Sequence, residues 1–366
     1  MGSSIAILDG NCYLHSGDAQ WSKDYHFMGF PTGGIYQLMS KICNLQAKRI
    51  PYFVVFDSPS FRKNVNSDYK KSRKVDYKIL AQANAIIPML KYAGVNCIHV
   101  PGFEGDDLIA NIVQANRNFD FVIYTCDYDL AINVSKNVKV CGCKQGFPSI
   151  NNQNFNVIMS RVNNMDIPYN ALGIHKVIFG CDSDEIMNIG PEAEKVWNVF
   201  RAIYKRDYED KDLSLVISKN YCEKFISAVE SMFNSNTVRK FKENIELVYP
   251  RMLTEKEIAE HSVDLSVNDK VVDTDLADVC RVFGLRKCYS VLTNDKSPEA
   301  MELTEKEKVW ILRRAKDYNL RVDAVNAEID INAEVKFNSN SNNNLSDVDS
   351  TSGFSLAANG LNIGAF

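Results

Sequence analysis

The sequence of 366 residues has no long hydrophobic run, although 45% of its residues are hydrophobic. A membrane-spanning helix needs about 20 consecutive apolar residues, and the apolar stretches here are much shorter. Residues 1–4 lead into a short apolar run at 5–8, without the basic start and longer apolar segment of a signal peptide. We therefore expect a globular chain in the cytoplasm, with no membrane partner.

A zinc-type cysteine pattern is also missing. The ten cysteines are scattered, and the one close pair, Cys141 and Cys143, has no second pair or suitably spaced histidine beside it. Because no export signal is recognised, reduced thiols are expected rather than a disulfide framework. We expect Cys141 and Cys143 to be structural thiols rather than metal ligands.

Short apolar runs alternate with helical patterns in the first 145 residues. Expected strands are 5–8, 52–56, 95–100, 121–124 and 137–140, and helical spacing occurs at 34–47, 79–92, 107–115 and near Leu130. This alternation predicts an α/β fold with a central, mainly parallel sheet that has helices on both faces. Residues from about 150 to 325 are expected to be mainly helical, and the Asn-rich and Ser-rich composition from Phe337 onward predicts a disordered tail.

Acidic residues follow four of the expected strands at or just after their carboxyl ends. They are Asp9, Asp57, Glu104, Asp106, Asp107 and Asp127. A single Asp after a strand is often only a helix N-cap, but the carboxyl ends of parallel strands converge on one crevice. Carboxylates gathered there repel one another unless cations bind among them, and oxygen-only ligands favour Mg²⁺ or Mn²⁺. The pattern predicts metal-assisted hydrolysis of phosphodiester bonds.

A basic segment follows Asp57, although the net charge of the chain is −4. Residues 61–78 carry the bases Arg62, Lys63, Lys70, Lys71, Arg73, Lys74 and Lys78. Charge runs are usually solvated surfaces, but beside an acidic crevice we interpret this one as a phosphate-binding segment, with Tyr69 or Phe61 free to stack on a base.

These motifs resemble the 5′ nuclease (flap endonuclease) family, which includes the 5′ nuclease domain of bacterial DNA polymerase I and the phage RNase H-type 5′ to 3′ exonucleases. The resemblance rests on ILDG at 7–10, PTGGIY at 31–36, VVFDSPSFR at 54–62, DYKKSR at 68–73, GFEGDDLIA at 102–110 and TCDYDL at 125–130. Their order and spacing match the family over about residues 5–190, and KFKENIELV at 240–248 extends the similarity.

The matching positions imply roles for individual residues. The family's metal-binding acids match Asp9, Asp57, Glu104, Asp106, Asp107, Asp127 and Asp129. Lys70 matches the lysine at the base of the helical arch and Arg73 the arginine that acts with it, so both are expected to be catalytic. Nucleic-acid contacts are expected from Arg62, Lys63, Tyr69, Lys70, Lys71, Arg73 and Lys74.

The resemblance also implies an overall organisation and activity. It implies a PIN-like catalytic domain over 1–190 with a basic helical arch at about 60–80, an α-rich DNA-binding domain over 191–330, and the tail over 337–366. The implied activity is that of a structure-specific 5′ to 3′ exonuclease or flap endonuclease with two Mg²⁺ or Mn²⁺ ions, acting in primer removal during replication. Its expected substrates are DNA with a 5′ end, flap or nick, or an RNA–DNA hybrid, in a bacterial or phage-infected cell.

The stretch FGCDSDEIMNIGPEAEKV at 179–196 departs from the family pattern. Cys181 takes the place of the first acid, so Asp182 with Asp184 is expected to restore the metal-binding pair, unless Asp182 is only a surface residue or N-cap. Only a remnant of the helix-hairpin-helix turn remains at 188–191, which weakens the expectation of duplex binding there.

Two alternatives stay open: a PIN-like ribonuclease, which would generally lack the basic arch, and a non-catalytic DNA-binding scaffold. The tail carries the isolated apolar residues Phe354, Leu356, Leu361, Ile363 and Phe366. Such residues on a polar tether can dock on a replication clamp or a single-strand-binding protein, or the tail can be a solvated segment without a partner.

Overall fold

The structure, a computed structural model, describes residues 4–21, 25–163, 167–207, 215–267 and 273–341. Contacts divide the chain into a compact unit, Met1–Tyr318, and a second unit, Asn319–Phe366. The described part of the second unit is the continuation of one long helix to Ser341. Residues 337–341, predicted to belong to a disordered tail, instead continue this helix. The rest of the predicted tail, 342–366 with its apolar residues, lies outside the described residues.

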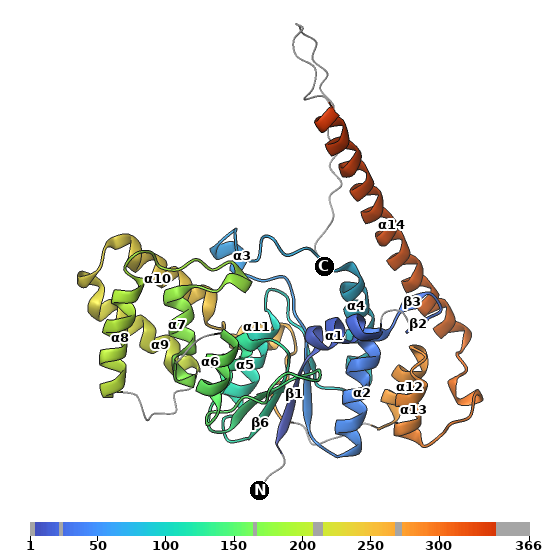
Figure 1. The fold of residues 1–366 in the computed structure, drawn as a ribbon. Helices are drawn as coiled ribbons and strands as arrows, with labels where there is room; N and C mark the ends of the chain where they lie inside the picture. Colours follow the sequence, from blue (N-terminus) through green and yellow to red (C-terminus); the bar gives the residue numbers. More distant parts are fainter. Residues whose placement is uncertain (1–3, 22–24, 164–166, 208–214, 268–272, 342–366) are drawn as a thin grey trace, which may run out of the picture. The chain divides into compact units, whose positions relative to one another are not determined.

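A parallel sheet lies at the centre of the first unit, with the strand order β5-β4-β1-β6-β7 (Figure 1). Its strands are β1 (Ile5–Asp9), β4 (Tyr52–Val55), β5 (Cys97–Ile98), β6 (Phe121–Tyr124) and β7 (Val138–Cys141). The five expected strands are therefore confirmed, although β5 is shorter than predicted. Because β1 pairs with both β4 and β6, its last residue, Asp9, lies between the carboxyl ends of two neighbours.

Helices connect the strands, and a small hairpin precedes the second helix. These elements are α1 (Gly10–Trp21), β2 (His26–Phe27), β3 (Phe30–Pro31), α2 (Gly33–Ala47), α4 (Tyr77–Tyr92), α5 (Gly105–Ala115) and the 3₁₀ turn η1 (Tyr128–Asn133). Helix α1 was not expected, because few of its residues are apolar. It is held instead by close packing on α2: a Cβ atom at Gly34 would lie 2.6 Å from the carbonyl oxygen of Leu14.

The second half of the unit is helical, as predicted. Its elements are α6 (Phe155–Asn163), η2 (Tyr169–Ala171), α7 (Leu172–Phe179), η3 (Asp182–Asp184), α8 (Ala193–Asp207), α9 (Leu215–Val229), η4 (Glu230–Met232), α10 (Ser235–Val248), α11 (Glu255–Glu260), α12 (Asp273–Val282), α13 (Arg286–Thr293), η5 (Glu299–Met301) and α14 (Glu305–Ser341).

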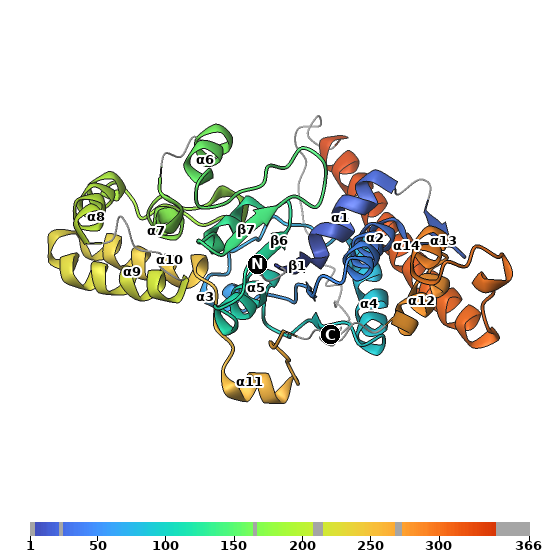
Figure 2. The same cartoon turned by 90° about the horizontal axis from the view of Figure 1, so that it is seen from below.

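The two faces of the sheet bury different hydrophobic cores. Side chains alternate along β1, so that Ile7 lies in one core and Leu8 in the other. The first core also contains residues of α7 to α10, such as Phe241, and the second contains residues of α12 and α13, such as Val279. In Figure 2, α8 to α10 and α12 to α13 accordingly lie on opposite sides of the strands. Both faces of the sheet are thus covered, and the helical segment after the sheet contributes to both cores.

The basic segment is less helical than the expected arch. Helix α3 covers only Arg62–Val65, and turns follow it up to Asp76, which caps α4. The helix ends because Asn66 is extended, and Lys70 adopts a left-handed backbone with φ 49° that an α-helix excludes. Bases concentrated in a short segment also repel one another, which disfavours a continuous helix.

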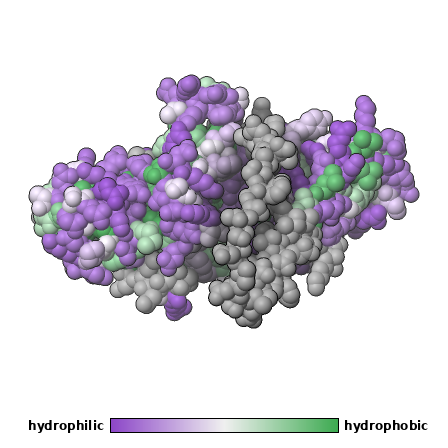
Figure 3. All heavy atoms as spheres, turned by 90° about the horizontal axis from the view of Figure 1, so that it is seen from above, coloured by the Kyte–Doolittle hydropathy of each residue, from purple (hydrophilic) through white to green (hydrophobic). Residues whose placement is uncertain are grey.

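Hydrophilic side chains cover most of the described part of the face shown in Figure 3. Among the described residues, no helix combines the length and apolar character that crossing a membrane requires.

Candidate active site

Four acids line the carboxyl edge of the sheet, each fixed by a different element. Asp9 ends β1 and accepts hydrogen bonds from the Cys12 amide (2.9 Å) and the Thr125 hydroxyl (2.7 Å). Asp57 follows β4 and accepts hydrogen bonds from the Gly105 amide (2.6 Å) and the Asn11 side chain (2.9 Å).

The other two acids come from the start of α5 and from the turn after β6. Asp106 lies in the first turn of α5, and Asp127 caps η1 by accepting a hydrogen bond from the Asp129 amide at 2.8 Å. The structure therefore brings together acids from four separate segments, as the spacing predicted.

Repulsion among these acids is visible in their pKa values. Burial, followed by the negative charges of Asp57 and Asp127, raises the pKa of Asp9 to about 7. Burial and then Asp127 raise the pKa of Asp106. The side chain of Asp127 reaches solvent, but desolvation by the surrounding protein, followed by the charge of Asp129, still raises its pKa. Acids held this close, each disfavouring the charge on the next, are the arrangement that a bound cation relieves.

The donor set fits a hard divalent cation. All four side chains offer carboxylate oxygens, and Asp57 and Asp127 are exposed, so an ion can reach them. Among the described residues, these four are not in a group whose ligand atoms all lie within 4.8 Å of one another. A cation that keeps several waters, as Mg²⁺ does, fits such spacing better than one that needs only protein ligands.

A second group beside the first contains Asp129, Cys181 and Asp184, whose ligand atoms lie within 4.8 Å of one another. The Cys181 sulfur lies 3.5 Å from Oδ2 of Asp129, while the Lys176 ammonium lies 2.5 Å from Oδ1. Burial alone would raise the pKa of Asp129, but Lys176 lowers it.

This second group does not fit a hard cation as well as the first. Sulfur is a poor ligand for Mg²⁺, and the buried ammonium of Lys176 already supplies a positive charge. Asp184 lies in the group as expected. Asp182 is exposed and lies outside it, so the expected replacement of the lost acid has no geometric support here.

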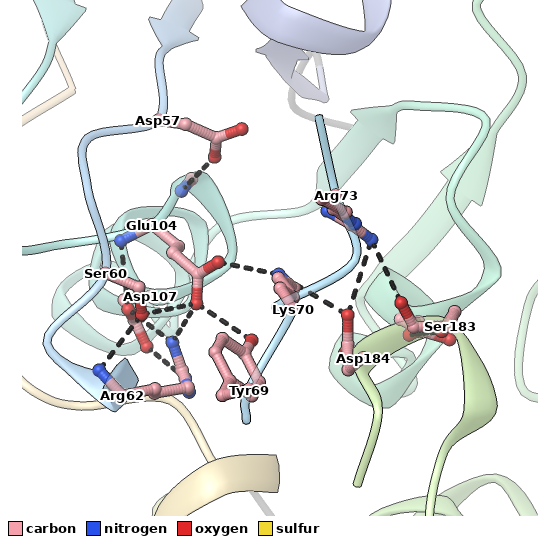
Figure 4. Close-up of polar contacts among 12 residues, drawn as sticks. Asp57, Ser60, Arg62, Tyr69, Lys70, Arg73, Glu104, Asp107, Ser183 and Asp184 are labelled. Carbon is pink, nitrogen blue, oxygen red and sulfur yellow. Dashed lines mark hydrogen bonds and ion pairs between the residues drawn. The ribbon is translucent and has the colours of Figure 1, made fainter. Parts of the chain in front are cut away.

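Glu104 and Asp107 are joined by Arg62 (Figure 4). The Arg62 guanidinium donates to Asp107 at 2.7 and 3.0 Å and to Glu104 at 2.6 Å, and its Nε donates to the Leu247 carbonyl. Asp107 is 0% exposed and also accepts a hydrogen bond from the Arg251 amide. This differs from the expected roles, since Arg62 is 3% exposed and holds two acids instead of a phosphate, while Asp107 has its oxygens occupied.

Tyr69 and Lys70 also converge on Glu104. The Tyr69 hydroxyl donates to Oε2 of Glu104 at 3.0 Å, and the tyrosine is only 3% exposed, so its ring is not on the surface where a base could stack. Phe61 is half-buried, with the Arg62 and Arg251 guanidinium groups 5.0 and 5.3 Å from its ring centroid. The expected stacking role therefore lacks an exposed ring at either position.

Lys70 is held near the acidic edge of the sheet by negative charge on both sides. Its Nζ lies 2.6 Å from Oε1 of Glu104 and 3.4 Å from Oδ1 of Asp184. Burial would lower the pKa of Lys70, but Glu104 raises it, and the same pairing with Lys70 and Arg62 lowers the pKa of Glu104 to about 2 against the effect of burial. Lys70 is a charged group at a strained backbone position, which is frequent at functional sites.

The remaining predicted bases are exposed. Arg73 is 56% exposed, with one guanidinium nitrogen 3.4 Å from Oδ1 of Asp184, and Lys71 pairs with Asp68 at 2.9 Å. Lys63 and Lys74 are exposed as well. These side chains can therefore meet a phosphate backbone without first breaking a buried contact.

Three contributors to the site were not predicted. Thr125 orients Asp9, Lys176 neutralises Asp129, and the Glu185 carboxylate accepts hydrogen bonds from the amides of Lys71 and Ser72, which ties the basic segment to the turn after α7. One signal was available for Lys176, because it is the single lysine in the apolar helix LGIHKVIF. A buried lysine needs a nearby anion.

Comparisons with known proteins find similarity to 5′-3′ exonucleases. The family model described as the 5′-3′ exonuclease N-terminal resolvase-like domain matches residues 4–160. A 5′-3′ exonuclease of Aquifex aeolicus is 34% identical over 144 residues, covering 37% of this chain and 50% of that protein. A 5′-3′ exonuclease of Mycoplasma genitalium is 31% identical over 203 residues, covering 50% of this chain and 68% of that protein.

Structural similarity was found to T5 5′-exonuclease with bound zinc, at a TM-score of 0.47 and 15% identity, over 85% of this chain and 99% of that one. The chain spans about half the length of several of the curated relatives that it matches.

Proposed function

This chain belongs to the 5′-3′ exonuclease family, and from that premise we propose that it hydrolyses phosphodiester bonds near the 5′ end of a nucleic-acid strand. The observation that carries the proposal is the set Asp9, Asp57, Asp106 and Asp127, whose carboxylates come from four segments. Burial, together with the charges of Asp57 and Asp127, raises the pKa values of Asp9 and Asp106. A structural role alone would not require such mutual repulsion.

Asp9, Asp57, Asp106 and Asp127 would hold the catalytic cation, Mg²⁺ or Mn²⁺. When bound, such an ion activates a water and stabilises the charge on the phosphate. Hydrogen bonds from the Thr125 hydroxyl and the Cys12 amide hold the carboxylate of Asp9 in place. A hydrogen bond from the Gly105 amide does the same for Asp57. The protein thus pre-arranges its acids before substrate arrives.

We propose that Lys70 and Arg73 position the phosphate next to those acids. Lys70 is restrained between Glu104 and Asp184, so its charge sits at one place near the edge of the sheet. Arg73 is half-exposed and keeps N–H groups available for phosphate oxygens. Lys63, Lys71 and Lys74 would add salt-dependent affinity for the strand.

The number of tightly held ions is proposed to be one among the described acids. The ammonium of Lys176 pairs with Asp129 and neutralises its charge. Cys181 offers sulfur at a position where a second hard cation would require an oxygen ligand. A fixed ammonium can stabilise developing negative charge without leaving when salt or chelator changes.

The proposed substrates are DNA with a 5′ end, a flap or a nick, and RNA–DNA hybrids, as in primer removal during replication. The turn between α7 and α8 is proposed to meet duplex DNA less strongly than a complete helix-hairpin-helix would. Docking of the tail on a replication clamp or a single-strand-binding protein remains a separate proposal, since that segment lies outside the described residues.

The test is cleavage of 5′-labelled flap, nicked duplex and RNA–DNA hybrid by the full chain, with Mg²⁺ and with chelator. Asp127→Asn, purified in the same way, controls for contaminating nucleases. We expect cation-dependent release of short 5′ products by the wild type only. Cleavage that persists in chelator or in Asp127→Asn, or no cleavage of any 5′-ended substrate, would overturn the proposal.

A further inference from the structure

The thiols of three residues that are far apart in the sequence lie close together beside Asp9. Cys12 lies in the first turn of α1, Cys126 follows β6, and Cys143 follows β7. The Cys143 sulfur lies 3.0 Å from that of Cys12 and 2.9 Å from that of Cys126, and all three sulfurs lie within 4.8 Å of one another. Cys141, which is close to Cys143 in the sequence, is not part of this group and contacts Ser149.

The spacing of the sulfurs is typical of neither a disulfide nor ordinary apolar packing. A disulfide bond is about 2.05 Å long, so the three are free thiols. Cys143 contacts two sulfurs at once, which a single disulfide cannot satisfy. With metal–sulfur bonds of about 2.3 Å, three thiolates around one ion would lie about 3.8 Å apart, which small side-chain rotations reach from here.

One backbone amide points directly at a sulfur of the cluster. The Cys126 amide donates to the Cys12 sulfur at 3.0 Å. The Cys143 amide donates to the Thr125 carbonyl at 3.2 Å, which holds the loop after β7 against the residue that precedes Cys126. Backbone hydrogen bonds thus hold two different loops together at the cluster.

We propose that Cys12, Cys126 and Cys143 form a binding site for one thiophilic cation, Zn²⁺ or Cu⁺. Thiolate ligands select these ions over Mg²⁺, so this site and the acidic edge would bind different metals side by side. Each coordinating thiol releases its proton to solvent on binding. Cys143 is buried, but Cys12 and Cys126 are half-buried, which leaves an entry path and room for an outside fourth ligand.

The site is connected to the acidic edge through the backbone. The amide of Cys12 donates to Asp9, and Cys126 stands between Thr125, which also donates to Asp9, and Asp127. An ion held by these thiols would restrain the same turns that position the carboxylates of Asp9 and Asp127. The inference does not rest on the proposed nuclease activity, because thiol coordination can be measured without substrate.

A second thiol group provides an internal control. Cys43, Cys280 and Cys288 interact with one another but are buried in the apolar core between α2 and α12 to α13, at 2%, 0% and 3% exposure. No member of this group is exposed enough to admit an ion with a solvent ligand. Of these two thiol groups, we therefore expect only Cys12, Cys126 and Cys143 to bind a thiophilic cation.

The experiment uses the full chain, reduced and freed of metal under anaerobic conditions, and titrated separately with Co²⁺ and Cu⁺. Thiolate coordination of Co²⁺ gives charge-transfer absorption that carboxylates do not produce. We expect the charge-transfer signal to saturate at one thiolate-bound equivalent of either ion, since Co²⁺ held by the acidic edge does not contribute to it. Zn²⁺ should displace the thiolate-bound Co²⁺, and the signal should be lost in Cys143→Ser but kept in Cys43→Ala. Asp127→Asn should bind as the wild type does, which separates this site from the catalytic one.

Alkylation of the wild type tests the same proposal without depending on whether a variant folds. With Zn²⁺ or Cu⁺ bound, peptide mass spectrometry should find Cys12, Cys126 and Cys143 protected and Cys141 and Cys181 still reactive. Absence of charge transfer together with unprotected thiols for both ions would overturn the proposal. So would loss of the signal in Cys43→Ala, or a disulfide at Cys143 in protein prepared with reductant.

Discussion

The ammonium of Lys176 lies 2.5 Å from Oδ1 of Asp129, beside the sulfur of Cys181. Both charged side chains are largely buried, so the pair is screened less by water than a surface salt bridge. Its position within the second acidic group means that a positive charge is already built into the protein there. The number of divalent cations that bind should therefore depend on Lys176, and it can be measured directly.

Replacing Lys176 should change the metal stoichiometry. In Lys176→Met the charges of Asp129 and Asp184 lose their permanent partner, so a second divalent cation should bind to neutralise them. Mn²⁺ binding followed by calorimetry should rise from one equivalent to two, and half-maximal cleavage should need several-fold more Mg²⁺. Lys176→Arg keeps the charge and should keep one equivalent; two equivalents in the wild type would refute this account.

Two aspartates that look equivalent in the sequence should behave differently. Asp127→Asn should abolish cleavage while leaving thermal stability and DNA binding unchanged or stronger, because an exposed carboxylate that repels phosphate is removed. Asp107→Asn should lower the free energy of unfolding by roughly 1.5–3 kcal/mol, since it removes one of the two negative charges that pair with the buried Arg62 and weakens hydrogen bonds to that charge. Denaturant unfolding and cleavage assays on both variants separate the roles, and equal stability of the two would contradict them.

Much of this site follows from local sequence, and the rest depends on contacts between distant residues. Apolar runs such as 52–56, each ended by an acid, identify the strands and place Asp9, Asp57 and Asp127 at one edge, because parallel strands converge there. Helix α1 escaped prediction since its stability comes from glycine-mediated packing on α2 rather than from an amphipathic pattern.

The same limit applies to individual side chains. Arg62 is one base among several in the sequence, and only the fold shows that its guanidinium reaches acids more than forty residues away. Cys12, Cys126 and Cys143 likewise have no regular spacing, because three different loops bring them together. Charge type was predictable from residue identity; whether a charge faces solvent or another side chain was not.

Two lysines of the basic segment should differ in the kinetic constant that they affect. Lys70→Ala removes a charge fixed beside the acids and should lower kcat by about 10²-fold with a smaller effect on affinity, as for a group that acts on the transition state. Lys74→Ala removes an exposed charge and should weaken DNA binding and reduce the slope of log affinity against log salt by about 1. If both variants change only the dissociation constant, the positioning role of Lys70 is wrong.

The raised pKa of Asp9 predicts how stability depends on pH in the absence of metal. Its folded-state pKa is about 7 against an ordinary 3.8, so the folded protein holds a proton there that the unfolded chain has released. This contribution is fully present below about pH 4 and is lost as pH rises to 7. With chelator present, the wild type should therefore lose more thermal stability between pH 5 and 8 than Asp9→Asn.

Adding Mg²⁺ should reverse that trend by raising the melting temperature more at pH 8 than at pH 5, because the cation binds the deprotonated carboxylate. The control is Asp18, an acid that pairs with Lys78 away from the edge, and its replacement in Asp18→Asn should keep the wild-type pH profile. Identical profiles for the wild type and Asp9→Asn would show that Asp9 does not carry the effect.

The last prediction concerns the acid missing from the second group. Cys181, rather than Asp182, lies with Asp129 and Asp184, and Asp182 is exposed outside the group. Asp182→Asn should therefore give a Mg²⁺ titration of cleavage that matches the wild type.

Cys181→Asp should place a carboxylate beside Asp129 and Asp184 and so improve binding of a second cation, because an oxygen ligand replaces sulfur. Cys181→Ser, of nearly the same size but without the charge, is the matched control and should leave the Mn²⁺ stoichiometry at one equivalent. In Cys181→Asp a second, weaker equivalent should appear, and it should tighten further when Lys176→Met is added, since both changes make the group more negative. A severe loss of cleavage in Asp182→Asn, with Cys181→Asp silent, would instead assign the missing acid to Asp182.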